Sequence, residues 1–160
     1  REVSAKIGEM VTYTEMWAHA MDGVEHGAHM DEGGLMSLGS MTGMNIYFAQ
    51  TSARMVQILR EVSGSGLIMQ PSENDLANPE LRPYLDRYMR GKGVDAEYKS
   101  RLYRLAHDLA VSSSGMRQEV YEYWHGGDPN RNRINLLRGF DQDATRGRIE
   151  DLISRPLPHG

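Results

Sequence analysis

The residues best suited to binding a ligand lie in the second half of the chain. The run Ser112–Gly115 consists of small residues, and Arg117 and Gln118 follow it closely. Small side chains let a ligand approach the backbone, and the planar guanidinium of arginine matches phosphate or carboxylate. This combination favours a flat or phosphorylated ligand. The spacing of these residues taken alone is explained more simply by a kinked helix that binds no ligand.

A second candidate for anion binding lies downstream, at Gly127–Arg131. Within it, Asp128 is typical of a helix N-cap, and Pro129 suits the first helical position. The free N–H groups and the dipole of a helix N-terminus attract anions. Because a capping Asp128 weakens that attraction, an ordinary turn is the competing interpretation.

A histidine-rich stretch is a weaker candidate for a metal site. His26, His29, Asp31 and Glu32 fall within seven residues, a spacing that serves metal binding when the residues share a helix. Several glycines in the same stretch instead predict a polar loop, where this spacing has little meaning. We therefore expect no metal.

Other short motifs do not predict catalysis. His107–Asp108 and Glu122–His125 each place an imidazole near a carboxylate, but their spacing defines no nucleophile or base geometry. The glycine pairs in Gly64–Gly66 and Gly91–Gly93 lack the preceding strand and following helix of a dinucleotide loop. We expect helix breakers at both glycine pairs and no catalytic residue in the chain.

Composition limits the class of protein. The chain has 160 residues, 39% of them hydrophobic and 25% charged, and a net charge of −4, which indicates one globular domain with neither nucleic acid nor a membrane as partner. The absence of cysteine excludes disulfides and thiolate sites and is compatible with the cytoplasm, where we expect the protein. The helical pattern already includes the first residue, Arg1, which suggests that the chain is a piece of a longer protein.

Helical periodicity dominates the chain, and strand signals are almost absent. The predicted helices cover residues 2–24, 42–62, 79–89, 95–109 with an extension to 124, 129–140 and 141–153. The predicted fold class is all-α, an antiparallel helical bundle that forms one domain over residues 1–160, with a tail at 155–160.

Glycine, proline and capping residues predict the connections. His26–Gly43 should form an irregular loop, and Gly66–Pro71 a short extended link. Ser72 and Asp75 have the spacing of a helix cap, and Pro79 suits the first position of a short helix. The eleven methionines are mostly expected in the core, with some on an adaptable apolar surface. The inward face of helix 129–140 is predicted to carry Ile134, Leu137 and Phe140.

Two runs, Gly115–Glu122 and Gly126–Asn132, resemble the C-terminal signature of the 4-hydroxyphenylacetate 3-hydroxylase family. Three upstream runs resemble the link that precedes it in that family: Gly66–Glu73, Leu76–Leu81 and Arg90–Val94. Because the matches occur in order, the resemblance covers most of the chain, from about residue 7 to residue 153.

This resemblance implies that the chain is the C-terminal domain of a longer enzyme with a fold like that of acyl-CoA dehydrogenases. The family implies reduced FAD, supplied by a separate flavin reductase, and molecular oxygen. The implied reaction hydroxylates a phenolic small molecule next to its hydroxyl group. The implied assembly is a homo-oligomer, a tetramer, and the isolated chain is expected to be inactive.

The resemblance also places cofactor contacts on particular residues. They are Ser113, Ser114, Gly115, Arg117, Gln118, Gly126, Gly127, Asp128 and Asn130. Family members often carry two glycines before the arginine, whereas Gly115 and Met116 stand here. Met116 adds bulk where the backbone would approach the flavin, so Arg117 and Gln118 are the favoured contacts.

Two alternatives belong to other classes of function. The chain could be a non-catalytic helical module for oligomerisation, with a methionine-rich apolar face that associates with its own copies. It also resembles 4-hydroxybutyryl-CoA dehydratase, although more weakly, and could be a relative of that enzyme. The absence of cysteine disfavours that relative, because its iron–sulfur cluster requires cysteine ligands.

Overall fold

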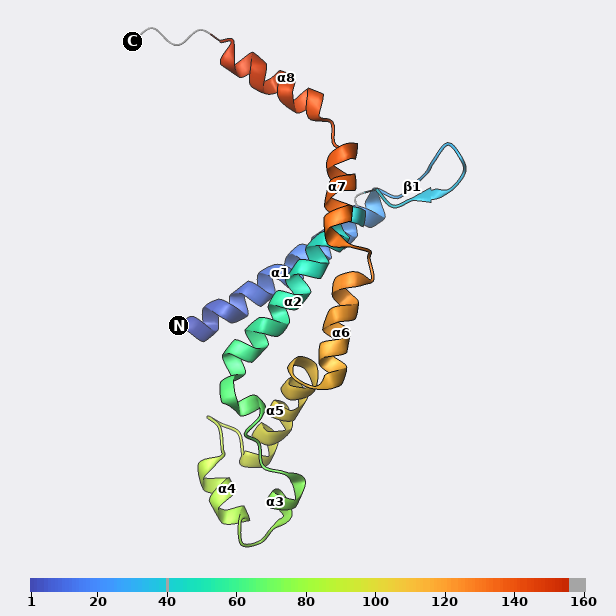
Figure 1. Ribbon diagram of the computed structural model, residues 1–160. Coiled ribbons are helices and arrows are strands. Elements are labelled where there is room, and N and C mark those ends of the chain that lie inside the picture. Colours follow the sequence, from blue (N-terminus) through green and yellow to red (C-terminus); the bar gives the residue numbers. More distant parts are fainter. Residues whose placement is uncertain (40, 156–160) are drawn as a thin grey trace, which may run out of the picture.

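The computed structural model describes residues 1–39 and 41–155 and is built almost entirely of helices (Figure 1). The longer helices are α1 (Glu2–His26), α2 (Met41–Ser63), α5 (Ala96–Ala110), α6 (Ser113–Trp124), α7 (Pro129–Gly139) and α8 (Gln142–Ile153). The shorter elements are the strands β1 (His29–Met30) and β2 (Met36–Ser37), the 3-10 helix η1 (Gly64–Leu67), α3 (Glu73–Ala77) and α4 (Arg82–Tyr88). The predicted all-α class is confirmed.

Helix α2 is the centre of the bundle, because α1, α5, α6 and α7 all pack against it. The helices α1 and α2 run side by side in Figure 1, joined by the hairpin β1–β2. Ile58 of α2 is fully buried, and Ala96, Ser100 and Ala110 of α5 are almost completely buried. Small residues on α5 let it pack closely onto its neighbours, so the core is narrow.

The connection after α1 differs from the predicted irregular loop. Antiparallel pairing of β1 and β2 places His29 opposite Ser37 and Met30 opposite Met36, and the hairpin projects from the bundle (Figure 1). Asp31 closes its tip, since one carboxylate oxygen accepts the backbone N–H groups of Gly33 at 2.9 Å and Leu35 at 2.8 Å. Strands of two residues are too short to show alternation in a sequence.

The predicted extension of the helix from 109 to 124 is wrong, because helix α5 ends at Ala110 and a separate helix begins at Ser113. The Ser112 side chain accepts the Gly115 N–H at 3.0 Å and donates to the Asp108 carbonyl oxygen at 2.7 Å. Serine competes with the helix for backbone hydrogen bonds and therefore favours a cap. The serine run thus starts a new helix, α6, rather than lining a continuous one.

Capping predictions succeeded where a side chain bonds to the backbone nearby. Ser72 and Asp75 form a reciprocal capping box, and Asp95 caps α5 through the Tyr98 N–H. Pro79 is not at the start of a helix: α4 begins at Arg82, with Pro83 in its first turn. The predicted extended link from Gly66 is also corrected at its beginning, because Gly66 and Leu67 belong to η1.

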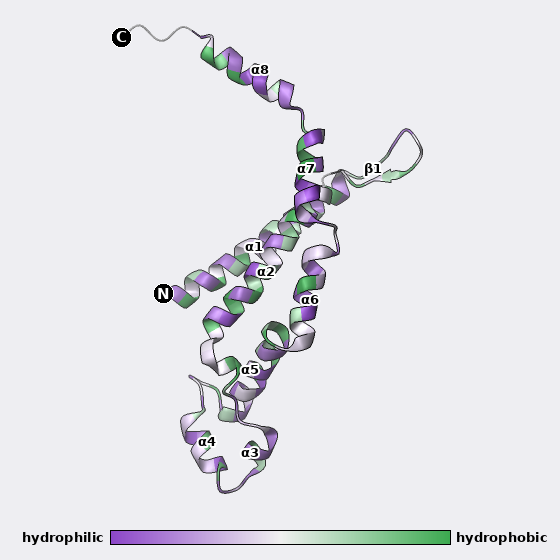
Figure 2. Ribbon diagram, viewed as in Figure 1, coloured by the Kyte–Doolittle hydropathy of each residue, from purple (hydrophilic) through white to green (hydrophobic). Residues whose placement is uncertain are grey.

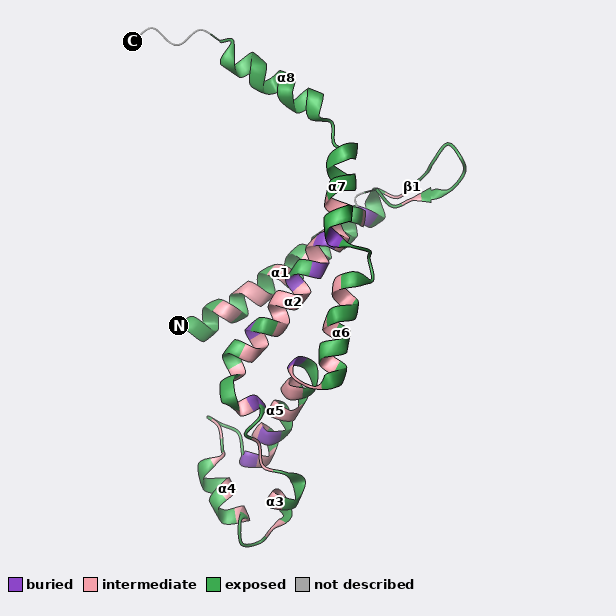
Figure 3. Ribbon diagram, viewed as in Figure 1, coloured by how far each residue is buried: buried purple, intermediate pink, exposed green. Residues whose placement is uncertain are grey.

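Large apolar side chains are exposed on several helices. Ile134, Leu137 and Phe140 are 51%, 59% and 61% exposed, so the predicted inward face of α7 is wrong. Helix α7 packs against α2, whereas α8 extends away from the other helices (Figure 1). Most hydrophobic positions of both helices in Figure 2 are exposed positions in Figure 3. The stripe on α5 formed by Tyr98, Leu102, Leu105 and Leu109 is exposed as well.

Within the described residues, no helix is both long and apolar enough to cross a membrane.

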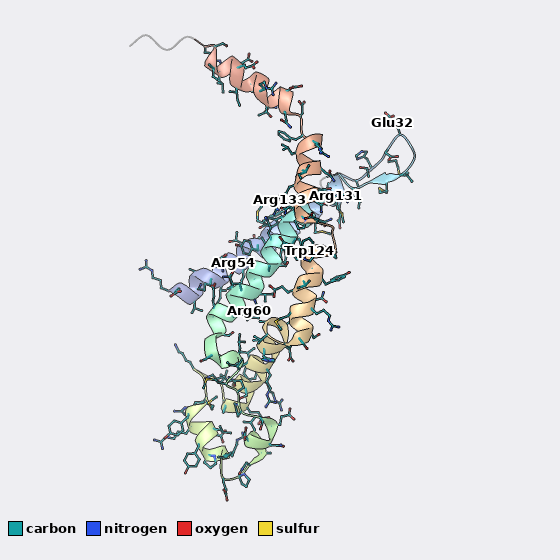
Figure 4. The ribbon with its side chains drawn as sticks, viewed as in Figure 1. Glu32, Arg54, Arg60, Trp124, Arg131 and Arg133 are labelled. Carbon is teal, nitrogen blue, oxygen red and sulfur yellow. The ribbon has the colours of Figure 1, made fainter. Side chains whose placement is uncertain are left out.

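A charged network joins α1 to α2. The guanidinium of Arg54 (labelled in Figure 4) donates to both carboxylate oxygens of Glu9, at 2.7 and 3.0 Å, and to Glu61 at 3.1 Å. Lys6 also pairs with Glu61, and the Tyr13 hydroxyl donates to Glu9 at 2.7 Å. The Arg54 and Tyr13 hydrogen bonds lower the pKa of Glu9 to about 2. The network therefore holds Glu9 ionised in the folded protein.

We expect this network to make the fold acid-sensitive. A carboxylate whose pKa is lower in the folded state than in the unfolded state stabilises the fold. This stabilisation is complete at pH values above the ordinary pKa of 4.5. That contribution disappears as the pH falls toward about 2. The melting temperature should therefore drop more between about pH 5 and about pH 3 in the wild type than in a Glu9→Gln variant. Thermal unfolding followed by circular dichroism measures both, and equal drops would contradict the role given to Glu9.

Candidate functional site

A cavity of about 450 Å³ opens between α1, α2, α5 and α6. Its walls are apolar on α1 and α2, and its rim on α5 and α6 is polar. The lining residues are Met10, Ser52, Met55, Val56, Leu59, Asp108, Leu109, Ser114, Gly115, Gln118, Glu119 and Glu122. Three predicted cofactor residues, Ser114, Gly115 and Gln118, thus lie together at one cavity.

Gly115 has a structural role that the sequence did not reveal. An added Cβ at this position would lie 2.4 Å from the Asp108 carbonyl oxygen and 2.6 Å from that of Leu109. Both atoms belong to the backbone of α5, so glycine here is required by the close approach of α6 to α5. The predicted reason, close approach of a ligand to the Gly115 backbone, is therefore not needed to explain the residue.

Carboxylates dominate the rim of this cavity. Asp108, Glu119 and Glu122 line it, and the described lining residues include no lysine, arginine or histidine. Arg60, labelled in Figure 4, lies beside the rim, where it pairs with Glu119 at 2.8 Å and donates to the Ala110 carbonyl at 2.7 Å. Like charges repel, so the cavity suits a neutral apolar group better than a phosphate.

Gln118 is oriented by a neighbour on its own helix. Its amide nitrogen donates to Glu122 Oε1 at 2.5 Å, one turn further along α6. This bond fixes the amide at the cavity rim and leaves its carbonyl oxygen able to accept from a ligand. The sequence pattern did not predict Glu122, Asp108 or Glu119 as residues of a cavity rim. The spacing of Gln118 and Glu122 on one helix face was the available signal.

Arg117 does not join the cavity. It is exposed and absent from the cavity lining, as are Ser113 and Met116. The side chains of Met116, Val120, Tyr121 and Trp124 are also exposed on α6. The structure therefore divides the predicted segment 113–118 between a cavity face, which includes Ser114 and Gln118, and an exposed face, which includes Arg117.

The predicted turn at Gly126–Asn130 lies beyond the other end of α6. The twelve residues of α6 span about 18 Å at 1.5 Å per residue, so the turn is remote from Ser113. Gly127 has a φ of +91°, a left-handed conformation that favours glycine. Gly126 packs against Asn45 of α2, with 3.4 Å between the Asn45 Cβ and an added Cβ.

The polar groups of this turn are already engaged within the chain. Asp128 accepts the Asn130 N–H at 2.9 Å and caps α7, as predicted. The Asn130 side-chain oxygen accepts from Arg133 at 2.7 Å, and the Gly126 carbonyl accepts from Asn132 at 2.8 Å. Arg131 and Arg133 are labelled near the start of α7 in Figure 4. The capping carboxylate reduces the attraction of this helix start for an anion.

The histidines predicted to be weak candidates bond mainly to backbone groups. His26 Nδ1 lies 2.8 Å from the Asp22 carbonyl, and His29 Nδ1 lies 3.0 Å from that of Gly27. Glu32 is at the tip of the projecting hairpin (Figure 4). Across residues 1–39 and 41–155, no group of three or more acidic or histidine side chains is arranged to hold a metal ion.

Comparison with known proteins identifies the family. The domain described as "4-hydroxyphenylacetate 3-hydroxylase C terminal" matches residues 1–154. This chain belongs to the 4-hydroxyphenylacetate 3-hydroxylase family. It is 31% identical to the 4-hydroxyphenylacetate 3-monooxygenase oxygenase component of Thermus thermophilus, covering 97% of this chain and 32% of that protein. It is 32% identical to the 4-nitrophenol 2-monooxygenase oxygenase component of a Rhodococcus species, covering 96% of this chain and 31% of that protein.

Solved structures of the 4-hydroxyphenylacetate 3-hydroxylase family have the same arrangement of helices. A crystal structure of an oxygenase component complexed with FAD superposes with a TM-score of 0.84 at 31% identity, over 94% of this chain and 32% of that one. A 4-hydroxybutyryl-CoA dehydratase from N. maritimus superposes with a TM-score of 0.82 at 21% identity, over 99% of this chain and 33% of that one, which shows a shared fold alone. The chain thus spans about a third of the length of these relatives.

Proposed function

We propose that this chain is the flavin-supporting domain of a phenol hydroxylase that uses reduced FAD and molecular oxygen. The observation that carries the proposal is its match, over nearly the whole chain, to an oxygenase component whose structure contains FAD. A further structure of that kind contains FAD together with 4-hydroxyphenylacetate. A phenolic small molecule is therefore the proposed substrate, and a flavin reductase is the proposed transient partner.

The residues present fit different parts of the cofactor unequally. The apolar walls of the 450 Å³ cavity, with Ser114 and Gln118 at the rim, suit a flat neutral ring. Its three carboxylates do not suit the diphosphate. Arg117, on the exposed face of α6, offers the planar fork that binds phosphate. If Gln118 binds the flavin ring and Arg117 binds the phosphates, the diphosphate would lie against the exposed face of α6. Another domain or another copy of the chain would then cover it.

When bound, the reduced flavin would supply the electrons that activate oxygen. The part played by this chain would be to bind and orient the cofactor. Gln118, held by Glu122, would accept or donate one hydrogen bond at the ring edge. Met10, Met55 and Leu59 would exclude water from one side of the ring, which protects a reactive centre from side reactions. No residue of the chain is proposed to contact the reacting atoms of the phenol.

Oxygen transfer by the full-length protein tests this function. With a flavin reductase, NADH, FAD and ¹⁸O₂, we expect a phenolic substrate to gain one hydroxyl group that carries the label. Omission of the reductase should stop the reaction unless reduced FAD is added chemically. A full-length protein that binds reduced FAD but never labels a phenol would contradict the proposed hydroxylase function.

We also propose that the exposed apolar faces associate with other copies of the chain or with the other domains of the same protein. The stripe of Leu102, Leu105 and Leu109, more than half exposed on α5, is costly to leave in water. Light scattering should show an oligomer of the full-length protein, and a tetramer is the expected size. A monomer would contradict self-association. An oligomer that never binds flavin would instead support the non-catalytic module.

A further inference from the structure

A second cavity, of about 370 Å³, lies between α1, α2 and α6 near the start of α2. Three of the eleven methionines line it, Met21 from α1 and Met41 and Met44 from α2. His125, the residue that follows α6, lines the same cavity. Three thioethers and one imidazole, from three separate parts of the chain, therefore border one space.

These four side chains match the ligand preference of a soft monovalent cation. Thioether sulfur is a soft ligand that selects copper(I), and imidazole also binds copper. Hard cations such as Mg²⁺ and Ca²⁺ prefer oxygen ligands instead. Because the chain has no cysteine, methionine supplies all of its sulfur ligands. The flexible methionine side chain lets each sulfur move toward an ion without a shift of the helices.

The hydrogen bond made by His125 leaves one ring nitrogen suited to a metal. Its Nδ1 lies 3.0 Å from the Glu122 carbonyl oxygen. Because a carbonyl oxygen only accepts, Nδ1 carries the proton of the neutral imidazole, and Nε2 carries the lone pair. Histidine ligands of metals commonly donate their other ring N–H to a carbonyl in this way. The ring also stacks on Tyr121, with 5.4 Å between the centroids.

The surroundings of the cavity favour a single positive charge. The three thioethers and the neutral imidazole carry no charge, and the described lining includes neither lysine nor arginine. The Glu122 carboxylate stands at the rim, 3.6 Å from His125 Nδ1, and accepts from the Gln118 amide at 2.5 Å. These contacts hold the carboxylate as a counter-charge beside the cavity, so it does not need to be a ligand.

Two aromatic rings complete the wall of the cavity. The centroids of Trp17 and Phe48 lie 4.9 Å apart, and aromatic faces, that of tryptophan above all, attract cations. The Trp17 indole N–H donates to the Thr51 hydroxyl at 2.7 Å, which fixes this ring across the α1–α2 interface. Met21 is 46% exposed, so an ion can enter the cavity from solvent.

We propose that this cavity binds a soft monovalent metal cation, copper(I) or its chemical analogue silver(I), through Met21, Met41, Met44 and His125. The competing interpretation is that the three methionines only fill apolar space. The site lies within this chain and requires no flavin, so the proposal is independent of the hydroxylase function.

Silver(I) is a suitable probe, because it prefers soft ligands as copper(I) does and is not oxidised in air. The 160-residue chain, labelled with ¹³C at the methionine methyl groups, is titrated with silver nitrate in a chloride-free buffer. The methyl signals of Met21, Met41 and Met44 should shift together and saturate at one equivalent. The signals of Met30 and Met36, on the projecting hairpin, should stay in place. Equal shifts of all five signals would overturn the proposal.

Conservative variants separate ligation from packing. Met44→Leu keeps the volume of the side chain and removes the sulfur. Changes that only disturb the support of a metal ligand already weaken binding about 10- to 100-fold, so Met44→Leu should weaken silver(I) binding at least about tenfold by calorimetry. His125→Phe, which keeps a ring, should weaken it as well. Met116→Leu, at an exposed position of α6, is the control and should leave the affinity unchanged.

Unchanged silver(I) affinity in Met44→Leu, or an equal loss in Met116→Leu, would overturn the proposal. Tetramethylammonium should not displace silver(I), and displacement would show a cage of aromatic rings without thioether ligands. The comparison of Met44→Leu with Met116→Leu is repeated in the full-length protein, where silver(I) sites elsewhere affect both variants alike. Flavin titration is a separate measurement, so failure of the hydroxylase proposal remains distinguishable.

Discussion

Replacement of Gly115 by alanine should lower the free energy of unfolding by about 2 kcal/mol, and the melting temperature by about 4–8 °C, because α5 and α6 must separate. The new Cβ would lie 2.4 Å from the Asp108 carbonyl oxygen and 2.6 Å from the Leu109 carbonyl oxygen. These are backbone atoms in the last turn of α5, so they cannot rotate away as a side chain would. The strain outweighs the gain in helix propensity of about 1 kcal/mol from glycine to alanine.

Gly8→Ala is a matched control for this change. Gly8 lies inside α1, and an added Cβ there would meet no heavy atom within 4 Å. Only helix propensity changes at that position, so the control should be more stable by about 1 kcal/mol. Urea and thermal unfolding of both variants, followed by circular dichroism, measure the difference. A Gly115→Ala protein as stable as Gly8→Ala would show that α5 and α6 do not meet as closely as described.

The features that local chemistry decides were predictable from the sequence. Helical spacing identified the long helices, and side-chain caps such as Ser72, Asp95 and Asp128 marked the beginnings of α3, α5 and α7. These interactions join residues two or three positions apart, so a sequence shows both partners together. The all-α class followed from the same local signals.

Features that depend on distant contacts were not predictable in this way. Periodicity predicts an apolar face on α7, but it cannot predict whether another element covers that face. Leu137 on this face is exposed in the structure. The break at Ser112 was missed because the helical pattern resumes on the far side with a compatible spacing. Pro79 has the character of a helix start, yet Asn78 instead accepts the Glu80 N–H at 2.9 Å in a turn.

The candidate site was predicted as one segment, and the structure divides it. Ser114 and Gln118 are four residues apart, so one face of α6 carries both, with Glu122 one turn further on. Ser113 and Arg117 are also four apart and lie outside that face. Helical spacing would have separated the two groups. The same spacing places Glu122 on the cavity face, but it could not predict Asp108 at the rim, because Asp108 comes from a different helix.

The second large expected effect is on cofactor affinity. Arg117 is the one predicted contact with the charge and planar geometry for a flavin phosphate, and no ion pair with an acidic side chain engages it within the described residues. Loss of a charge-assisted hydrogen bond costs about 1.5–3 kcal/mol. Arg117→Ala in the full-length protein should therefore weaken reduced-FAD binding roughly 10- to 100-fold. Arg117→Lys should recover part of the loss, because lysine keeps the charge but not the fork.

Arg138 of α7 provides the control, since it is also an exposed arginine on a helix. Its replacement by alanine removes the same charge from the chain, and reduced-FAD affinity should change by no more than about twofold, because screening weakens the field of a distant exposed charge. A similar loss in both variants would indicate an effect of net charge alone.

The most direct test of the claim that this chain supports the flavin is an anaerobic titration of the full-length protein with reduced FAD. It compares the wild type with Arg117→Ala and Arg138→Ala. We predict saturable binding by the wild type and by Arg138→Ala, and a large loss of affinity in Arg117→Ala alone. Wild-type affinity in Arg117→Ala would contradict the assignment of Arg117, and an absence of reduced-FAD binding by the wild type would contradict the flavin-supporting function itself.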